Sequence, residues 1–194
     1  MLADDIAHFS AIPWCAKLIA EKDVMPIDKT GRDAEYKKMG GNVGLFIVET
    51  LSSERTIRAD LNFCLLPLRQ GRFPIETLLT LYDIGPGVNT TLKTAAHGGF
   101  VATMLDETSG RLLQANMQIS VKDPSQPRPV WVTRSTTLEF KRPVPVENVV
   151  LVRAKLEKDE EKSCRVVASI EDEHGAVLCT SDALFVEQRG RGKL

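Results

Sequence analysis

Residues 94–113, which read TAAHGGFVATMLDETSGRLL, constrain the fold most because they combine a glycine pair with a long helical pattern. Mostly apolar side chains recur there at intervals of three and four residues, the spacing of a helix with one buried face. The positions in this stripe are Phe100, Val101, Met104, Leu105, Thr108 and Leu112. At about 100° of rotation per residue, Asp106 falls on the opposite face. A helix of this kind needs a second layer of structure to cover its stripe.

The surroundings of Asp106 predict a surface that another molecule can approach closely. Its neighbours on that face of the helix are all small: Gly99, Ala102, Thr103, Ser109 and Gly110. Just before the helix, the glycine pair leaves backbone N–H groups free at the positive end of the helix dipole. Such an end can bind an anion or stabilise a developing oxyanion.

Three features in combination make the chain similar to a known family. His-Gly-Gly at residues 97–99 opens the helix, Asp106 lies nine positions after the histidine, and Phe-Lys-Arg-Pro ends a later strand at residues 140–143. On these residues the chain resembles the hotdog-fold acyl-CoA thioesterases, most closely the phenylacetyl-CoA (PaaI-like) and Them-type branch. The resemblance covers roughly residues 75–187 and leaves the N-terminal third unaccounted for. It implies an α+β fold, with an antiparallel β-sheet wrapped around one long central α-helix.

Upstream of the central helix, the pattern changes from helical to strand-like. Residues 3–22 are helical in pattern but contain Pro13, which predicts two short helices meeting near residues 10–13. Residues 25–41 are charged and lack a clear period, so we interpret them as an exposed connection. Strand patterns follow at residues 44–51 and 56–66, which we expect to form a hairpin, and at 77–82 before a turn at 83–87.

Downstream, the helix is expected to end at residues 110–113 and to be followed by a strand at 115–121. Residues 122–129 hold three prolines and are predicted to be a loop. Alternating patterns then predict an antiparallel meander with strands at 130–140, 149–156, 165–171 and 176–186. We therefore divide the chain into an N-terminal helical extension and linker (1–41), a hotdog domain (42–187) and a frayed basic tail (188–194).

Composition excludes several classes of function. A net charge of −1 gives no excess of positive charge of the kind that nucleic-acid-binding proteins carry. No run approaches the roughly 18 apolar residues of a membrane span. The four cysteines are scattered without metal-ligand spacing, which favours a reducing compartment. Asp4 and Asp5 occupy the region where a signal peptide needs positive charge, so we expect a cytoplasmic protein.

The chemistry of a thioesterase requires an activated water or a nucleophile, together with donors for the carbonyl oxygen. Asp106 can serve as general base or nucleophile, and the Gly98 backbone N–H can serve as oxyanion donor. His97 invites an acid–base interpretation, but the resemblance favours a turn-fixing role for it. Counting back from residues 140–143, the resemblance places Thr133 at the position whose hydroxyl holds the water or the acid, although Ser135 and Thr136 lie nearby.

Further residues are candidates for substrate binding: His97, Gly99, Asn89, Glu107, Lys141 and Arg142. Asn89 corresponds to a polar residue that precedes the glycine pair in the family, at a longer spacing here. Glu107 is the second choice of acid, and a rim or structural charge is its alternative role. Lys141 and Arg142 can meet the phosphates of coenzyme A, or can simply be solvated charges at a strand end. No metal ligand set is predicted.

The spacing of the two catalytic candidates bears on assembly. Gly98 and Asp106 are eight residues apart, which is about 12 Å along a helix. A reacting carbonyl must lie about 3 Å from both groups. A site shared between two antiparallel copies of the helix resolves this, so we expect a homodimer or a homotetramer built from two dimers, in agreement with the family.

The resulting prediction is hydrolysis of an acyl thioester of coenzyme A or of an acyl-carrier protein, without a metal or a redox cofactor. One alternative is a hotdog hydratase or dehydratase, which acts on the acyl chain with a histidine and an acid. The other is a non-catalytic acyl-binding module.

Overall fold

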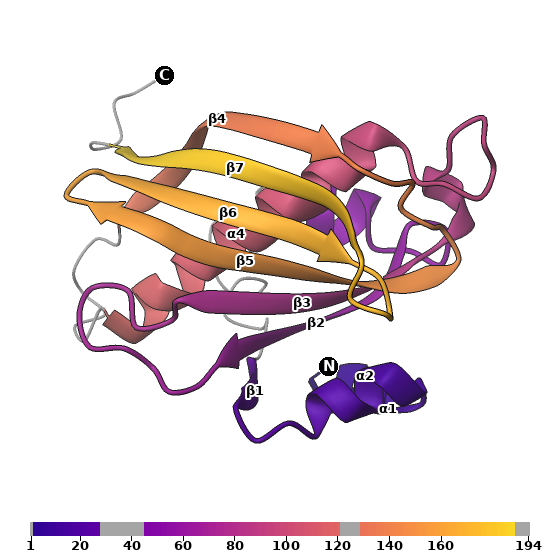
Figure 1. Ribbon diagram of the computed structural model, residues 1–194, viewed down its shortest axis with the longest axis horizontal. Helices are drawn as coiled ribbons and strands as arrows, with labels where there is room; N and C mark the ends of the chain where they lie inside the picture. Colours follow the sequence, from indigo (N-terminus) through magenta and orange to yellow (C-terminus); the bar gives the residue numbers. More distant parts are fainter. Residues whose placement is uncertain (1, 28–44, 121–128, 189–194) are drawn as a thin grey trace.

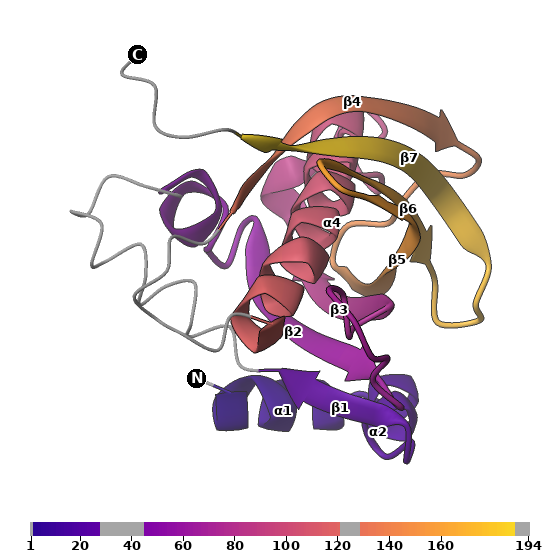
Figure 2. The same ribbon diagram turned by 90° about the vertical axis from the view of Figure 1, so that its left-hand side faces the viewer.

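The computed structural model describes residues 2–27, 45–120 and 129–188, and all structural statements concern these residues. The sheet has seven strands in the order β1-β2-β3-β5-β6-β7-β4, and every neighbouring pair is antiparallel. It curls around helix α4 (Gly98–Ser120), as Figures 1 and 2 show. The expected α+β architecture, a sheet wrapped around one long helix, is therefore confirmed.

The strands are β1 (Val24–Ile27), β2 (Ile57–Leu65), β3 (Thr77–Ile84), β4 (Val130–Phe140), β5 (Asn148–Glu160), β6 (Ser163–Glu171) and β7 (Val177–Gln188). The shorter helices are α1 (Leu2–Ser10), α2 (Pro13–Ile19), the π-helix η1 (Phe46–Thr50) and the 3-10 helix η2 (Pro86–Val88). The strands expected at 56–66 and 77–82, at 130–140 and in the C-terminal meander are all present.

The central strand β3 and the edge strand β4 have opposite environments. Every residue of β3 is buried, because α4 covers one face of the sheet there and α1 and α2 cover the other. Among the described strands, β4 pairs only with β7, and it is exposed along most of its length. The site described below lies on the side of α4 that faces this open edge.

Helix α4 is longer than the sequence pattern indicated. The expected end at residues 110–113 and the expected strand at 115–121 are wrong, because the helix continues to Ser120. Asn116 explains the difference. Its buried side chain accepts a hydrogen bond from the Ile75 N–H (2.7 Å) and donates to the Ile75 carbonyl (2.8 Å). These partners lie 41 positions away, so local periodicity does not reveal them.

Two expectations upstream of α4 are also wrong. The hairpin strand expected at 44–51 is absent from its described part, residues 45–51, because η1 occupies Phe46–Thr50. Residues 25–27, placed in the exposed connection, instead belong to β1, which pairs with β2. β1 satisfies backbone groups that β2 would otherwise leave unpaired at the edge of the sheet. Pro26 is compatible with this position because edge strands tolerate proline.

The N-terminal helices form a second hydrophobic core on the outer face of the sheet (Figure 1). They are two, as expected, and Pro13 sits in the first turn of α2, where its missing N–H is not needed. Phe9 and Cys15 are fully buried in this core, and Trp14 packs against it. Trp14 therefore helps to cover the outer face of the sheet.

Some predictions lie outside the described residues. The proline-rich loop at 122–129 and the basic tail at 188–194 are described only at Pro129 and Gln188, and the segment 28–41 of the predicted linker is not described. None of the described helices is long and apolar enough to span a membrane.

Candidate functional site

The turn that leads into α4 is closed by backbone hydrogen bonds. His97 N–H donates to the Val88 carbonyl (2.7 Å), and Ala96 N–H donates to the Val144 carbonyl (2.8 Å). Asn89 forms an antiparallel bridge with Ala96. These contacts fix the chain immediately before the helix, so that His97 is held at its first turn.

His97 caps the N-terminus of α4. Its carbonyl accepts the N–H of Val101 (3.0 Å), and its ring Nδ1 accepts the N–H of Gly99 (3.0 Å). No described residue accepts a hydrogen bond from the N–H of Gly98 or of Phe100. The helix therefore begins with some N–H groups occupied and the Gly98 N–H unoccupied, which is the state that an oxyanion donor requires.

Phe140, at the end of β4, lies over the Gly98 backbone. A Cβ atom added at Gly98 would lie 3.5 Å from this ring, and one added at Gly99 would lie 3.1 Å from His97 Nδ1. A side chain at Gly99 would thus push on the capping ring. Glycine at this position lets the imidazole approach the backbone closely.

Asp106 is exposed on the side of α4 that faces β4. The Thr133 hydroxyl donates a hydrogen bond of 2.8 Å to Asp106 Oδ1. The register of β4 against β7 shifts between Thr133 and Ser135, leaving Arg134 as an extra residue. Such a bulge re-aims the side chains beside it. The structure thus brings together Asp106 and Thr133, the two residues that the resemblance had paired; their catalytic roles remain predictions.

The helix surface next to Asp106 is small and mostly open. A Cβ atom added at Gly110 would meet no other atom within 4 Å. The Thr103 hydroxyl is bonded back to the Gly99 carbonyl (2.9 Å). Ser109, which the helical rotation placed on this surface, is fully buried and bonded to the Leu105 carbonyl, so that expectation is wrong.

Glu107 points into a network of ion pairs. Its carboxylate accepts a hydrogen bond of 3.0 Å from Arg111 Nε, and the same guanidinium contacts Asp60 and Asn62 on β2. Both side chains of the Glu107–Arg111 pair are only 11% exposed. Glu107 therefore links α4 to the sheet, which favours its structural alternative over substrate binding.

The other candidates lie near the start of α4. Asn89 Nδ2 donates to the Lys93 carbonyl (3.2 Å) within the preceding loop. Lys141 Nζ lies 3.4 Å from Glu139, and Arg142 is exposed directly after it in the chain. Because both cations follow Phe140, they lie close to the Gly98 end of the helix. Their contact with coenzyme A remains a prediction, as does a substrate role for Asn89.

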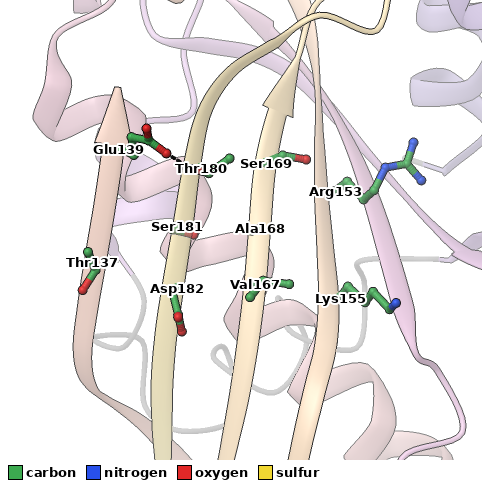
Figure 3. A pocket seen from close by; sticks show the side chains of 10 residues that line it. All are labelled: Thr137, Glu139, Arg153, Lys155, Val167, Ala168, Ser169, Thr180, Ser181 and Asp182. Atoms are coloured by element: carbon green, nitrogen blue, oxygen red, sulfur yellow. Dashed lines mark hydrogen bonds between the residues drawn. The ribbon is translucent and has the colours of Figure 1, made fainter. Parts of the chain in front are cut away.

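A hollow of about 470 Å³ lies on the outer face of the sheet, away from α4 (Figure 3). Its charged side chains are paired with neighbours: Arg153 with Glu171 (3.0 Å) and Asp182 with Arg165 (2.8 Å). The sheet separates this hollow from Asp106. We place the candidate active site at α4 and β4 because an acid and a hydroxyl are hydrogen-bonded there, beside a helix whose Gly98 N–H has no acceptor among the described residues.

A comparison with family models connects this geometry to known proteins. Residues 94–179 match the model of the thioesterase superfamily. This part of the hotdog domain is therefore similar to the thioesterase superfamily. The matched segment begins just before His97 and includes both Asp106 and Thr133. No curated protein sequence matches the chain.

Solved structures share the fold of this chain at low sequence identity. A putative thioesterase from Ralstonia eutropha JMP134, described as phenylacetic acid degradation-related, aligns with a TM-score of 0.52 and 18% identity over 78% of this chain and 97% of its own. The PaaI protein of Escherichia coli, from the phenylacetic acid degradation operon, aligns with a TM-score of 0.51 and 11% identity over 60% and 76%.

A hypothetical thioesterase from Streptococcus pneumoniae TIGR4, solved with coenzyme A, aligns with a TM-score of 0.51 and 13% identity over 65% of this chain and 88% of its own. At such identities these similarities establish the fold.

Proposed function

We propose that this chain hydrolyses acyl thioesters of coenzyme A. The observation that carries the proposal is the Thr133–Asp106 hydrogen bond of 2.8 Å on an exposed helix face, on the same helix as the unbonded Gly98 N–H. The superfamily match supports the reaction class. The coenzyme A bound to the S. pneumoniae thioesterase supports coenzyme A as the carrier, ahead of an acyl-carrier protein.

In the proposed mechanism, Asp106 either takes a proton from a water that attacks the thioester carbonyl carbon, or attacks this carbon itself and forms an anhydride that water then hydrolyses to restore the carboxylate. Thr133 holds Oδ1 and leaves Oδ2 available for this step. On either route the C–S bond breaks, and the thiolate of coenzyme A takes up a proton to leave as a thiol beside the carboxylic acid. The Gly98 N–H stabilises the oxyanion formed on the way, and one such donor contributes about 10²- to 10³-fold in rate.

The proposal includes a site shared between two copies of the chain. Gly98 and Asp106 lie about 12 Å apart along α4, too far for one carbonyl to reach both. No described strand pairs with the outer edge of β4, and three of its apolar side chains are exposed: Val130 (57%), Val132 (39%) and Phe140 (55%). A second copy docked at this edge would cover these side chains and bring its own Gly98 toward Asp106.

A cytoplasmic location is part of the same proposal. All four cysteines are free and buried, which is typical of a protein in a reducing compartment.

The test is a panel of acyl-CoA substrates that varies chain length and includes aromatic acyl groups. Release of free thiol is followed with a thiol-reactive dye, and the acid product is identified by mass. Hydrolysis of any member supports the proposal. A change in enoyl absorbance without thiol release would indicate a hydratase, and binding without either would indicate an acyl-binding module.

A further inference from the structure

We propose that His97 is a positioning residue for the oxyanion donor: its Nδ1 accepts the Gly99 N–H and thereby holds the Gly98 N–H free and directed toward the substrate. This inference rests on the proposed function, because it concerns the same site. It assigns to the imidazole a role as a hydrogen-bond acceptor and not as an acid or a base.

A helix leaves the backbone N–H groups of its first turn without acceptors inside the helix. Here the His97 N–H is bonded to Val88, and the Gly99 N–H is bonded to the His97 ring. Gly98 lies between these two bonded groups in the chain, and its N–H has no acceptor among the described residues. The bonds on either side fix the peptide plane of Gly98 and with it the direction of its N–H.

The geometry also fixes which form of the imidazole does this. An N–H donates to Nδ1, so Nδ1 carries no proton and the ring proton is on Nε2. A ring protonated at Nδ1 would direct its own N–H against that of Gly99. His97 therefore acts through Nδ1 only as an acceptor, the role that the short polar side chains of usual N-caps fill.

Gly99 is also part of this arrangement of the His97 ring and the helix N-terminus. With Nδ1 only 3.1 Å from the place of a Cβ atom at this position, a side chain would displace the ring from its acceptor position. The two glycines thus have different roles in this proposal. Gly98 provides the free donor, whereas Gly99 allows the ring that aims it to come close.

Replacement of His97 by alanine and by asparagine tests the inference. Asparagine is among the best N-cap residues, and its Oδ1 can accept the Gly99 N–H, but it cannot transfer a proton. We expect His97→Ala to lower kcat by about 10²-fold with little change in KM, since a misplacement of about 1 Å can have that effect. We expect His97→Asn to keep kcat within about threefold of wild type, since it restores the cap.

Two control variants separate positioning from general loosening of the fold. Ser120→Ala removes a hydrogen bond to the Arg72 carbonyl at the far end of α4 and should lower Tm without lowering kcat. His174→Ala removes an exposed histidine in the turn between β6 and β7 and should change neither. Tm is recorded for every variant, and rates are compared at a temperature where all are folded.

Three outcomes overturn the inference. If His97→Asn is as slow as His97→Ala while both remain folded, the imidazole has a role that an acceptor cannot replace. If His97→Ala keeps its kcat, the cap serves stability alone. If amide exchange in the wild-type protein shows Gly99 no better protected than Gly98, the cap does not exist in solution.

These results are distinguishable from failure of the proposed function. If no acyl-CoA is hydrolysed by wild type, both the function and the inference fall together. If the wild-type protein is active and Asp106→Asn is not, the proposed function is supported. The kcat of His97→Asn then tests the role of His97 separately.

Discussion

Asp106 and Glu107 are neighbours in the sequence, yet α4 gives them opposite surroundings. Asp106 is exposed beside the open edge strand and has a single described hydrogen-bond partner, Thr133. Glu107 is only 11% exposed and is held by Arg111, which also contacts β2. Residue type alone therefore does not assign a function to either of these two acids. An acid that leaves one oxygen free can react, whereas an acid engaged in an ion-pair network holds two elements together.

The largest effect is expected for Asp106→Asn, which keeps size but removes the base or nucleophile. Loss of a positioned general base lowers the rate by about 10²- to 10⁴-fold, and loss of a nucleophile can lower it more. Because the side chain is exposed, Tm should change little. kcat, KM and Tm of the purified variant check this. Full activity with intact folding would refute the proposed mechanism.

A mixture of two inactive variants tests whether the exposed side of α4 forms one half of a site that is shared between two chains. Gly98→Pro removes the backbone donor and should also lower kcat strongly, provided that the variant folds. In a mixed dimer of Asp106→Asn and Gly98→Pro chains, one site keeps both wild-type groups and the other carries both changes.

Activity of the mixture should therefore rise well above that of either variant alone. Subunit exchange must be confirmed with differently tagged chains before the rates are compared. Absence of recovery after confirmed exchange would show that each chain houses its own complete site.

The two acids could be told apart from the sequence, because a rotation of about 100° per residue turns adjacent residues to different faces. The sequence also led to Thr133, but through the resemblance at residues 140–143 and not through periodicity. Nothing in the composition reveals that β4 accommodates Arg134 as an extra residue, since a bulge is a property of pairing with β7.

Elements that depend on distant partners were predicted less well. α4 extends beyond residue 113 because Asn116 is satisfied by Ile75, far away in the chain. β1 forms because β2 offers it an edge. In both cases the deciding hydrogen bonds join segments that a local pattern cannot relate, whereas the strands of the meander alternate clearly enough to be recognised individually.

Asn116→Ala is expected to have the second largest effect, this time on stability. The change leaves a buried N–H and a buried carbonyl of Ile75 without their partner. Each such group destabilises a protein by about 1–3 kcal/mol. A total near 3 kcal/mol corresponds to a fall in Tm of about 6–12 °C for a chain of this size.

Chemical or thermal unfolding followed by circular dichroism measures this effect, and kcat of the remaining folded protein should stay close to wild type. A large loss of kcat at a temperature where the variant is folded would mean that the far end of α4 also shapes the site.

Glu107→Gln is expected to have the smallest effect and completes the comparison with Asp106→Asn, because the same charge is removed one residue away. Removing one partner of a buried ion pair destabilises by about 3–5 kcal/mol when the other charge is left alone. Arg111 retains Asp60 and Asn62, however, so a loss of about 1–2 kcal/mol is expected, seen as a fall in Tm of about 2–8 °C. Since Glu107 is held by Arg111, whose guanidinium contacts β2, kcat should remain within about twofold of wild type, in contrast to the loss of at least about 10²-fold expected at Asp106. Should Glu107→Gln instead lose turnover while keeping its Tm, the roles of the two acids would have to be exchanged.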